Sequence, residues 1–363
     1  MRILAVIDSF GLGGAETQLA EATTVLAEKL GHNCLACSLL PRQSHEVRLS
    51  NRVERAYLGK QSFLSLPWVA KRLARVIRRY RPDVVYSRLP LANGIARIVT
   101  SFPGCRVLHV AGIDTVPAVF TAVFTMRHPG SLVFRWLERF ADRIVCNSAS
   151  TARAVVAVGY PRQRIRVIPN GIDLDKFSPP AHRVVHEPAQ LVCVASFRPE
   201  KGVERLVRLL APLLGTGRAV LTLIGDGPER TKVETAIADL GLKETVHLLG
   251  PQEDVVPVLR RSDLYVSAAH VEGFGIAVAE AAGTGLPAVC AAAPGGLDEV
   301  VLNGVTGYLI PQGRDELFRE TVARLCSDAV LREQLGAAAR HHIRNNFDIH
   351  DIAVRLEHCF VNP

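Results

Sequence analysis

Short apolar runs alternate with longer amphipathic segments along the first half of the chain. The runs that predict buried strands are Ile3–Ile7, Cys34–Leu39, Val84–Tyr86, Val107–Val110, Ile144–Cys146 and Arg166–Ile168. Segments of helical length lie between several of them, namely Ala15–Leu30, Pro67–Tyr80 and Ala149–Val158. Alternation of this kind predicts a parallel sheet that is covered by helices on both faces.

The alternation stops between residues 171 and 190, a stretch that contains three prolines and has no periodic pattern, as is typical of a connection between domains. It starts again with strands predicted at Leu191–Ala195, Val220–Ile224, Val246–Leu249, Leu264–Val266 and Ala288–Cys290, and the chain is helical from Asp315 onward. The pattern predicts an α/β protein with two doubly wound, Rossmann-like domains, 1–175 and 191–346, which are joined by 176–190 and face each other across a cleft. Ligands of such sheets bind beyond the carboxyl ends of the strands.

The segment from Glu272 to Glu280 carries the most specific chemistry in the sequence. Gly273 and Gly275 allow a tight turn that approaches a ligand closely, and a helix is predicted to start near Ile276. The free N–H groups at a helix start bind phosphate, while Glu280 and Glu272 would accept hydrogen bonds from ribose and from a donor sugar. The segment therefore indicates a nucleotide-sugar site. The alternative is a plain turn followed by a packed core helix.

This segment resembles the glutamate-x7-glutamate signature of the retaining, nucleotide-sugar-dependent glycosyltransferases of family 4. Landmarks similar to those of the family follow in family order: Gly13–Glu16, Ile168–Asp173, Glu200–Gly202, Gly225–Pro228, Asp263–Ser267, Pro294–Val300 and Asn303–Pro311. The resemblance implies the GT-B fold, with a final helix (residues 347–363, beginning near Ile349) that crosses back onto the first domain. It also implies that Phe274 belongs to the donor site and that Gly250 and Pro251 border the pocket for the base.

The departing diphosphate needs positive charge, and Lys201 is the leading candidate to supply it. The alternative for this lysine is an exposed residue at a helix start. The family usually pairs it with an arginine in a Gly-Arg pair, but those two positions read Ala195-Ser196 here. Arg198 lies two residues later and is the candidate for the second cation. Ser196 itself is placed in the donor site by the resemblance.

The glycine-rich stretch Gly11–Glu16 follows the first predicted strand. The sequence argues against a dinucleotide fingerprint, because Glu16 occupies the third glycine position and no acidic residue ends the next strand. By the resemblance, Gly13 and Gly14 let the backbone of the first domain approach the donor.

Histidine candidates are less specific. The family often carries a His-Gly after the fourth strand, but here Ala111 takes the place of the histidine and His109 comes two residues early. His109 is a candidate catalytic residue beside the transferred sugar or, equally, a core histidine. His270 is a candidate on the acceptor side.

No metal or cofactor is expected. Asp173-Leu-Asp175 matches an Asp-x-Asp string but lies among residues that resemble a structural landmark of the family. Cys34 and Cys37 fall in a predicted strand, where residues three apart point to opposite faces. The cysteines lack the spacing of a disulfide framework, which fits a reducing cytosol.

The net charge of +8 allows an anionic partner, and much of it lies on the predicted helix that Pro67 opens. That helix is either a solvated surface element or a site for an anionic membrane surface. The apolar segment 113–134 is a mobile acceptor-side loop, a lipid-facing patch or a covered core segment. We found no signal peptide, no run long enough to span a bilayer and no nucleic-acid module.

The sequence thus predicts a cytoplasmic protein that acts as a metal-independent retaining hexosyltransferase, and it leaves open a peripheral association with the inner face of a membrane. The donor is a nucleotide diphosphate sugar, with a UDP-sugar favoured, and the acceptor is a glycan or a lipid-linked molecule. Two alternatives stay open. One is a sugar epimerase or phosphorylase of the same architecture. The other is an inactive binding subunit, which is suggested by Ser196 and Ala111 because the family usually carries an arginine and a histidine at these positions.

Overall fold

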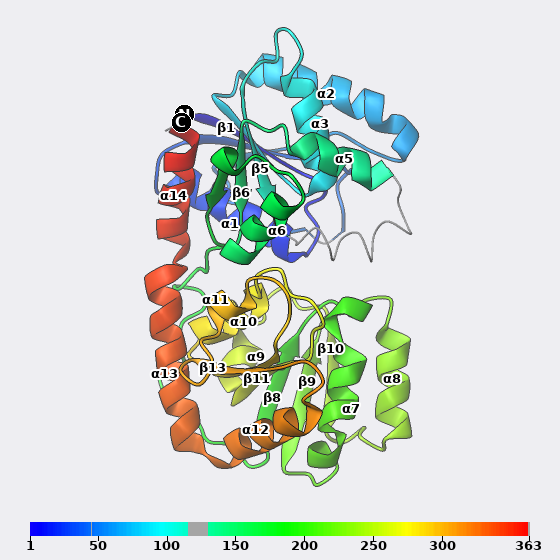
Figure 1. Cartoon of the computed structure of the whole chain (residues 1–363), viewed down its shortest axis with the longest axis vertical. Coiled ribbons are helices and arrows are strands. Elements are labelled where there is room, and N and C mark those ends of the chain that lie inside the picture. Colours follow the sequence, from blue (N-terminus) through cyan, green and yellow to red (C-terminus); the bar gives the residue numbers. More distant parts are fainter. Residues whose placement is uncertain (45, 115–129, 362–363) are drawn as a thin grey trace. The chain divides into compact units, whose positions relative to one another are not determined.

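The computed structural model describes residues 1–44, 46–114 and 130–361. The chain forms two compact units, one comprising Met1–Gly171 with Ile349–Pro363 and the other Ile172–Asp348 (Figure 1). Residues 176–190, expected as a connection, lie within the second unit. They are anchored there because Arg260 donates to the carbonyl of Ser178 and Arg183 donates to that of Ser262.

The first unit is built on a parallel seven-stranded sheet in the order β3-β2-β1-β4-β5-β6-β7. Its strands are β1 (Arg2–Ile7), β2 (Asn33–Ser38), β3 (Val53–Tyr57), β4 (Val84–Arg88), β5 (Leu108–Ile113), β6 (Arg143–Cys146) and β7 (Ile165–Val167). The sequence pattern predicted all of them except β3. This edge strand was missed because Glu54 and Arg55 are exposed and interrupt its apolar pattern.

Helices cover both faces of this sheet: α1 (Gly14–Glu28), α2 (Leu66–Tyr80), α3 (Pro90–Thr100), α5 (Gly130–Glu138), α6 (Ala149–Ala157) and α14 (Ile349–Val361). The sheet has one apolar core on each face, and strand β1 contributes side chains to both. Ile3, Ala5 and Ile7 pack with α1 and α14, while Leu4 and Val6 pack with α2 and α3. Successive side chains of a strand point to opposite faces, so one strand serves both cores.

The second unit repeats this architecture with a parallel six-stranded sheet in the order β10-β9-β8-β11-β12-β13. The strands are β8 (Ala189–Val194), β9 (Ala219–Ile224), β10 (Val246–Gly250), β11 (Leu264–Ser267), β12 (Ala288–Ala291) and β13 (Gly307–Ile310). The helices are α7 (Val203–Leu214), α8 (Arg230–Asp239), α9 (Val256–Arg261), α10 (Ile276–Gly283), α11 (Leu297–Val300), α12 (Asp315–Ser327) and α13 (Ala329–Asn346). The two-domain α/β fold predicted from the sequence is confirmed.

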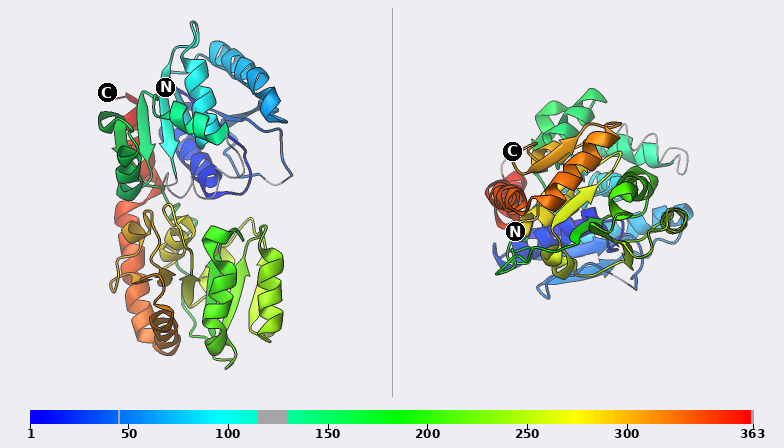
Figure 2. Two further views of the ribbon diagram at one scale, coloured as in Figure 1. Left: turned by 45° about the vertical axis from the view of Figure 1, so that its right-hand side comes forward. Right: turned by 90° about the horizontal axis from the view of Figure 1, so that it is seen from below.

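The last helix of the described chain returns to the first unit, as the family resemblance implied. Helix α13 ends at Asn346 in the second unit, and α14 packs against α1 in the first (Figure 1; Figure 2). Beside this contact, Nε2 of His32 lies within hydrogen-bond distance of Oε1 of Glu357, at 2.7 Å. Among the described residues, no helix is both long and apolar enough to cross a membrane.

The strand order of each sheet reverses once. The reversal lies between β1 and β4 in the first unit and between β8 and β11 in the second. At such a point the loops that follow the two strands diverge to opposite faces, which leaves a crevice at the carboxyl edge where ligands of open α/β sheets bind. The fold therefore places one candidate ligand position at the carboxyl edge of each sheet.

Candidate active site

The loop that follows β8 carries the predicted cations. Phe197 anchors this loop, since its side chain is buried and its N–H donates to the carbonyl of Asp226 at 2.8 Å. The N–H of Glu229 returns a bond of 2.9 Å to the carbonyl of Phe197. The Gly225–Pro228 landmark is thus the turn that holds the β8 loop in place. Ser196 and Arg198 remain exposed on either side of the buried phenylalanine.

Lys201 and Glu272 meet where the strand order of the second sheet reverses. Lys201 follows β8 and Glu272 follows β11, and the ammonium nitrogen lies 2.7 Å from Oε2 of the carboxylate. The backbone fixes this meeting, because the N–H groups of His270 and Val271 donate to the carbonyl of Glu200 at 2.9 and 3.3 Å. Both partners of the ion pair are partly exposed and so stay accessible to a ligand.

The signature loop is bound to the loop that follows β12. The N–H of Glu272 donates to the carbonyl of Pro294 at 3.2 Å, and that of Gly296 donates to the carbonyl of Gly273 at 2.8 Å. Gly295 lies between them with a φ of +136°, and a Cβ there would overlap the carbonyl of Glu272. The Pro294-Gly-Gly landmark is therefore explained by the close approach of two backbones beneath the predicted sugar-binding carboxylate.

Helix α10 begins immediately after this loop. Gly275 is its N-cap, with a φ of +90° and no side-chain cap, and a Cβ there would lie 2.8 Å from Cδ1 of Leu297. The first bond within the helix runs from the N–H of Ala279 to the carbonyl of Gly275, so the N–H groups of Ile276 and Ala277 precede it. Such a helix start offers oriented donors and partial positive charge to an anion.

Phe274 and Glu280 have different surroundings on either side of the α10 start. The ring of Phe274 is 2% exposed and packs edge-on against Phe347 at 5.3 Å, so it anchors the loop from within the core. Glu280 lies further along α10 and is partly exposed. Burial raises the pKa of Glu280 to about 7, while Lys176 opposes the shift. Within the described part of the chain, Lys176 is thus the one charged group that favours the ionised carboxylate of Glu280.

Gly250 and Pro251 end β10 at the same edge of the sheet. The carbonyl of Gly250 accepts a 2.9 Å bond from the N–H of Gly225, and Pro251 is exposed. The candidate residues of the second unit thus lie at or after the carboxyl ends of β8, β10 and β11, on one edge of the sheet.

In the first unit, Gly13 is the N-cap of α1 and Gly14 is its first residue. His109 lies in β5 and is fully buried. Its Nε2 lies 2.8 Å from Oγ of Ser87, and burial lowers the pKa of the imidazole to about 3. His109 and Ala111 are both fully buried in the first unit, which agrees with the alternative of a core histidine.

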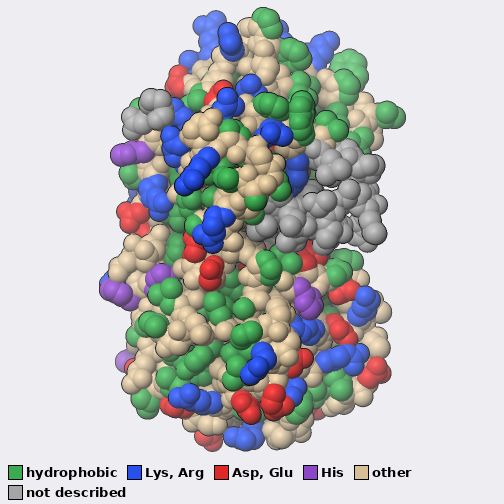
Figure 3. Space-filling view, viewed as in Figure 1, with side chains coloured by type: hydrophobic (Ala, Val, Ile, Leu, Met, Phe, Trp, Pro, Cys, Tyr) green, Lys and Arg blue, Asp and Glu red, His purple; other side chains and the backbone are tan. Residues whose placement is uncertain are grey.

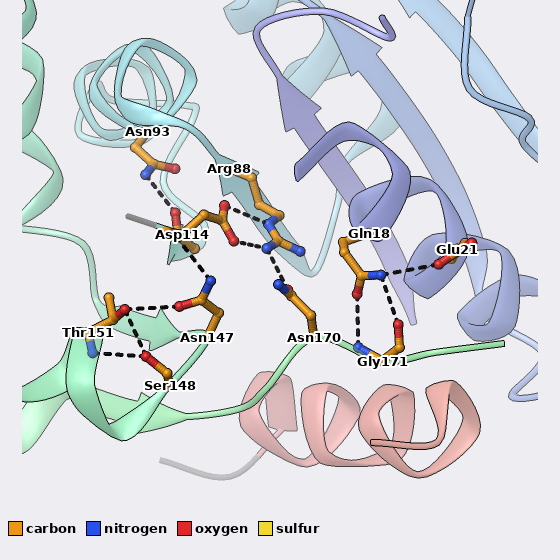
Figure 4. Close-up of polar contacts among 11 residues, drawn as sticks. Gln18, Glu21, Arg88, Asn93, Asp114, Asn147, Ser148, Thr151, Asn170 and Gly171 are labelled. Atoms are coloured by element: carbon orange, nitrogen blue, oxygen red, sulfur yellow. Dashed lines mark hydrogen bonds and ion pairs between the residues drawn. The ribbon is translucent and has the colours of Figure 1, made fainter. Parts of the chain in front are cut away.

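A polar network that sequence reasoning missed lies at the carboxyl edge of the first sheet (Figure 4). Arg88 forms two hydrogen bonds with the carboxylate of Asp114 and donates to Oδ1 of Asn170 at 2.9 Å. Asn147 donates to the carbonyl of Asp114 at 3.1 Å. These residues end or follow β4, β5, β6 and β7, and their common signal in the sequence is a polar residue within four positions of the end of an apolar run.

The strings that suggested metal sites have structural roles. Oδ1 of Asp173 accepts the N–H groups of Asp175 and Lys176, each at 3.0 Å, and thereby caps a turn. Cys34 and Cys37 are buried in opposite cores, as predicted. Within the described ranges, no group of three His, Cys, Asp or Glu side chains has the geometry to hold a metal ion. Of the apolar segment 113–134, residues 115–129 lie outside the described residues.

Two family models match consecutive parts of the chain. The model described as Glycosyltransferase Family 4 matches residues 12–176, and the model described as Glycosyl transferases group 1 matches residues 175–342. The division between the two models falls close to the division between the two compact units.

Curated relatives carry related names. The chain is 26% identical to a UDP-Gal:alpha-D-GlcNAc-diphosphoundecaprenol alpha-1,3-galactosyltransferase of Escherichia coli, over 76% of this chain and 74% of the relative. It is 27% identical to a GDP-mannose-dependent alpha-mannosyltransferase of Mycobacterium tuberculosis, over 94% and 92%. The chain spans about half the length of three further relatives, at 49%, 44% and 50%.

Among solved structures, the chain is similar to Anabaena Alr3699/HepE in complex with UDP and glucose. The TM-score is 0.81 at 22% identity, and 98% of each chain is covered. At this identity the likeness bears on the fold, and it agrees with two Rossmann-like sheets in the GT-B order.

Proposed function

Since the chain belongs to glycosyltransferase family 4, we propose that it transfers a hexosyl group from a nucleotide diphosphate sugar to a glycan or lipid-linked acceptor with retention of anomeric configuration. The observation that carries the proposal is the ion pair between Lys201 and Glu272 at the strand-order reversal of the second sheet. A cation for a diphosphate and a carboxylate for a sugar lie within one hydrogen bond of each other there.

The ion pair defines what the donor exchanges on binding. A diphosphate beside Lys201 supplies the negative charge that Glu272 supplies in the ligand-free protein. The carboxylate is then free to accept hydrogen bonds from hydroxyl groups of the sugar. Arg198, exposed two residues after Ser196, adds a second cation, and the N–H groups that start α10 add oriented donors.

Transition-state stabilisation in this scheme is electrostatic. The glycosidic bond to the diphosphate breaks as the charge on the leaving oxygen grows, and Lys201, Arg198 and the α10 start are fixed before that charge develops. The acceptor hydroxyl attacks on the face that the diphosphate leaves, and a phosphate oxygen takes its proton. Glu280 holds the ribose. Protein cations and amides replace a divalent metal in these steps.

A UDP-sugar is the favoured donor. The support is that the E. coli relative uses UDP-galactose and acts on a lipid diphosphate acceptor, and that the HepE structure is a complex with UDP and glucose. The mycobacterial relative uses GDP-mannose, so the base has to be tested directly. Base recognition through the backbone near Gly250 and Pro251 leaves no side-chain signature for uracil or guanine.

Thermal unfolding with a panel of UDP, GDP, ADP and their hexose conjugates, with and without EDTA, tests donor binding. A nucleotide at 100 times its dissociation constant stabilises the protein by ~2.7 kcal/mol, which raises the melting temperature by several degrees. Lys201→Ala is expected to lose this stabilisation, while Lys243→Ala, an exposed lysine of the same unit, is expected to keep it. Glu272→Ala is expected to respond to the free nucleotide and to lose the further gain from the sugar.

The products separate the remaining possibilities. We expect transfer only in the presence of an acceptor, unaffected by EDTA, with the donor's anomeric configuration in the product by NMR. An inverted product contradicts retention, and loss of turnover in EDTA contradicts the metal-independent scheme. Turnover without an acceptor indicates an epimerase, a requirement for free phosphate indicates a phosphorylase, and nucleotide binding without any turnover indicates an inactive subunit.

A further inference from the structure

The surface segment from Leu58 to Pro82 is strongly cationic. It contains no aspartate or glutamate, and its basic residues are Lys60, Lys71, Arg72, Arg75, Arg78, Arg79 and Arg81. All of those that lie on α2 or at its C-cap have exposed side chains. The ion pairs found in the described part of the first unit involve other basic residues, so no carboxylate neutralises this surface there.

Helix α2 has two clearly different faces. Val69, Leu73, Ala74 and Ile77 pack into the core of the first unit. Trp68, Arg72, Arg75 and Arg79 follow one another at intervals of four, three and four residues, and therefore line the opposite face. We call this line the outer face of α2. It runs along a helix of 15 residues, about 22 Å long.

An exposed apolar cluster lies at the N-terminal end of the outer face, where Trp68 is joined by two residues that precede α2. Leu64 is 91% exposed, Trp68 64% and Phe63 46%. Ser62 and Ser65 cap the short turn at Phe63–Ser65 and hold these side chains outward. Lys71 lies 5.2 Å from the ring of Trp68, so aromatic and cationic groups are adjacent. Figure 3 shows both hydrophobic side chains and Lys and Arg side chains at the surface in the region where Figure 1 draws α2.

The cationic surface continues past the end of the helix. Arg78, Arg81 and Arg106 border a groove of about 440 Å³ between the C-terminus of α2 and the loop that precedes β5. The groove also has apolar walls from Ile77 and Val107. Three guanidinium groups around one groove are suited to phosphate oxygens, which arginine binds through its planar fork of donors.

We propose that the outer face of α2 binds the surface of an anionic lipid bilayer. Phe63, Leu64 and Trp68 enter the boundary between headgroups and acyl chains, and the arginines along the helix contact lipid phosphates. A bilayer provides both an apolar layer and a negative charge in one plane, and the outer face presents both along one line. A soluble polyanion would leave the aliphatic side chain of Leu64 without a partner.

Sedimentation with vesicles tests the proposal, comparing pure phosphatidylcholine with a 3:1 mixture of phosphatidylcholine and phosphatidylglycerol. We expect binding to the anionic vesicles alone. Each basic residue near such a surface contributes about 1 kcal/mol to the free energy of binding. We therefore expect Arg75→Gln/Arg79→Gln to weaken binding about 30-fold. The matched control is Lys243→Gln/Arg261→Gln, which removes two exposed charges from the second unit and is expected to bind like the wild type.

Fluorescence tests the apolar part. The chain has two tryptophans, so Trp136→Phe leaves Trp68 as the sole reporter. We expect its emission to shift to the blue on anionic vesicles, and Leu64→Ser to reduce the shift together with the affinity. Equal binding to neutral vesicles, unchanged binding of the double arginine variant or an unshifted spectrum would overturn the proposal, as would binding to heparin with none to vesicles. Thermal stabilisation by nucleotides serves as the folding control and is independent of this result.

Discussion

Ionisation of the Glu280 carboxyl destabilises the folded state. Burial on α10 raises the pKa of its carboxyl from 4.5 to about 7, and Lys176 compensates only in part. Glu280→Gln keeps the size of the side chain and removes the ionisable group. We therefore expect this variant to be more stable than the wild type in the ligand-free state at alkaline pH, although it loses a residue of the proposed ribose site.

The sign and size of the effect follow from proton binding. Between pH 4.5 and pH 7 the folded state holds a proton on Glu280 that the unfolded chain releases, so the free energy of unfolding falls as pH rises through this window. The difference between the two pKa values corresponds to ~3 kcal/mol. Solvent screens this partly exposed carboxylate, so we expect about 1–2 kcal/mol above pH 7. For a domain of this size that is ~3–6 °C in melting temperature.

Thermal unfolding of the ligand-free protein at pH 5 and pH 8 measures the effect. Glu280→Gln is expected to melt ~3–6 °C above the wild type at pH 8 and within ~1 °C of it at pH 5. Glu244→Gln, at an exposed position of the same unit, is the control and is expected to melt like the wild type at both pH values. A difference of equal size at both pH values, or a lower melting temperature at pH 8, would refute the reasoning.

Three further substitutions test the packing around the sites. Gly295→Ala places a methyl group against the carbonyl of Glu272, so we expect a lower melting temperature and loss of nucleotide-sugar stabilisation. An unchanged response would contradict the role of the close backbone approach at Gly295. Phe274→Ala removes a buried ring and is expected to cost about 3–5 kcal/mol in urea unfolding, whereas a cost below 1 kcal/mol would mean that the ring is not a core anchor. Asp114→Asn leaves the buried Arg88 without its counter-ion, so we expect ~3 kcal/mol of destabilisation by the same assay and no change if the pair is solvated.

The architecture could be predicted because parallel strands buried on both faces leave continuous apolar runs. Edge strands do not leave such runs. In β3, Val53 is buried while Glu54 and Arg55 are exposed, so the apolar pattern is lost although the ladder to β2 is complete. The short β13 begins at Gly307, and in the sequence it stands out only as part of a family landmark.

For the candidate site, the sequence indicates where the residues lie along the strands and loops but not what each side chain contacts. Spacing placed Glu272 and Lys201 at the carboxyl edge of one sheet, yet their 2.7 Å contact joins residues 71 apart in sequence. Phe274 lies between two glycines of the signature loop, and nothing in that spacing shows that its ring points inward. His109 and Ala111 share one strand face, and only the surrounding packing makes both core residues.

Arg88 and Asp114 are residues whose pairing the sequence alone does not predict. Each follows an apolar run and was available as a polar residue at a strand end. Pairing them requires knowing that β4 and β5 are neighbours, with Arg88 level with Gly112. A single sequence contains the residues of such a network, whereas the register of the sheet determines its bonds.

The return of α14 to the first unit has a consequence for the order in which the two units fold during translation. Ile349, Ile352 and Leu356 belong to the same core as β1 and α1, yet they are translated only after the whole of the second unit. Until then, the face of the nascent first unit that α14 covers stays open to water. We expect the later-made, contiguous unit to reach its native state first, with the earlier one waiting for its missing helix, which reverses the usual N-terminal-first order.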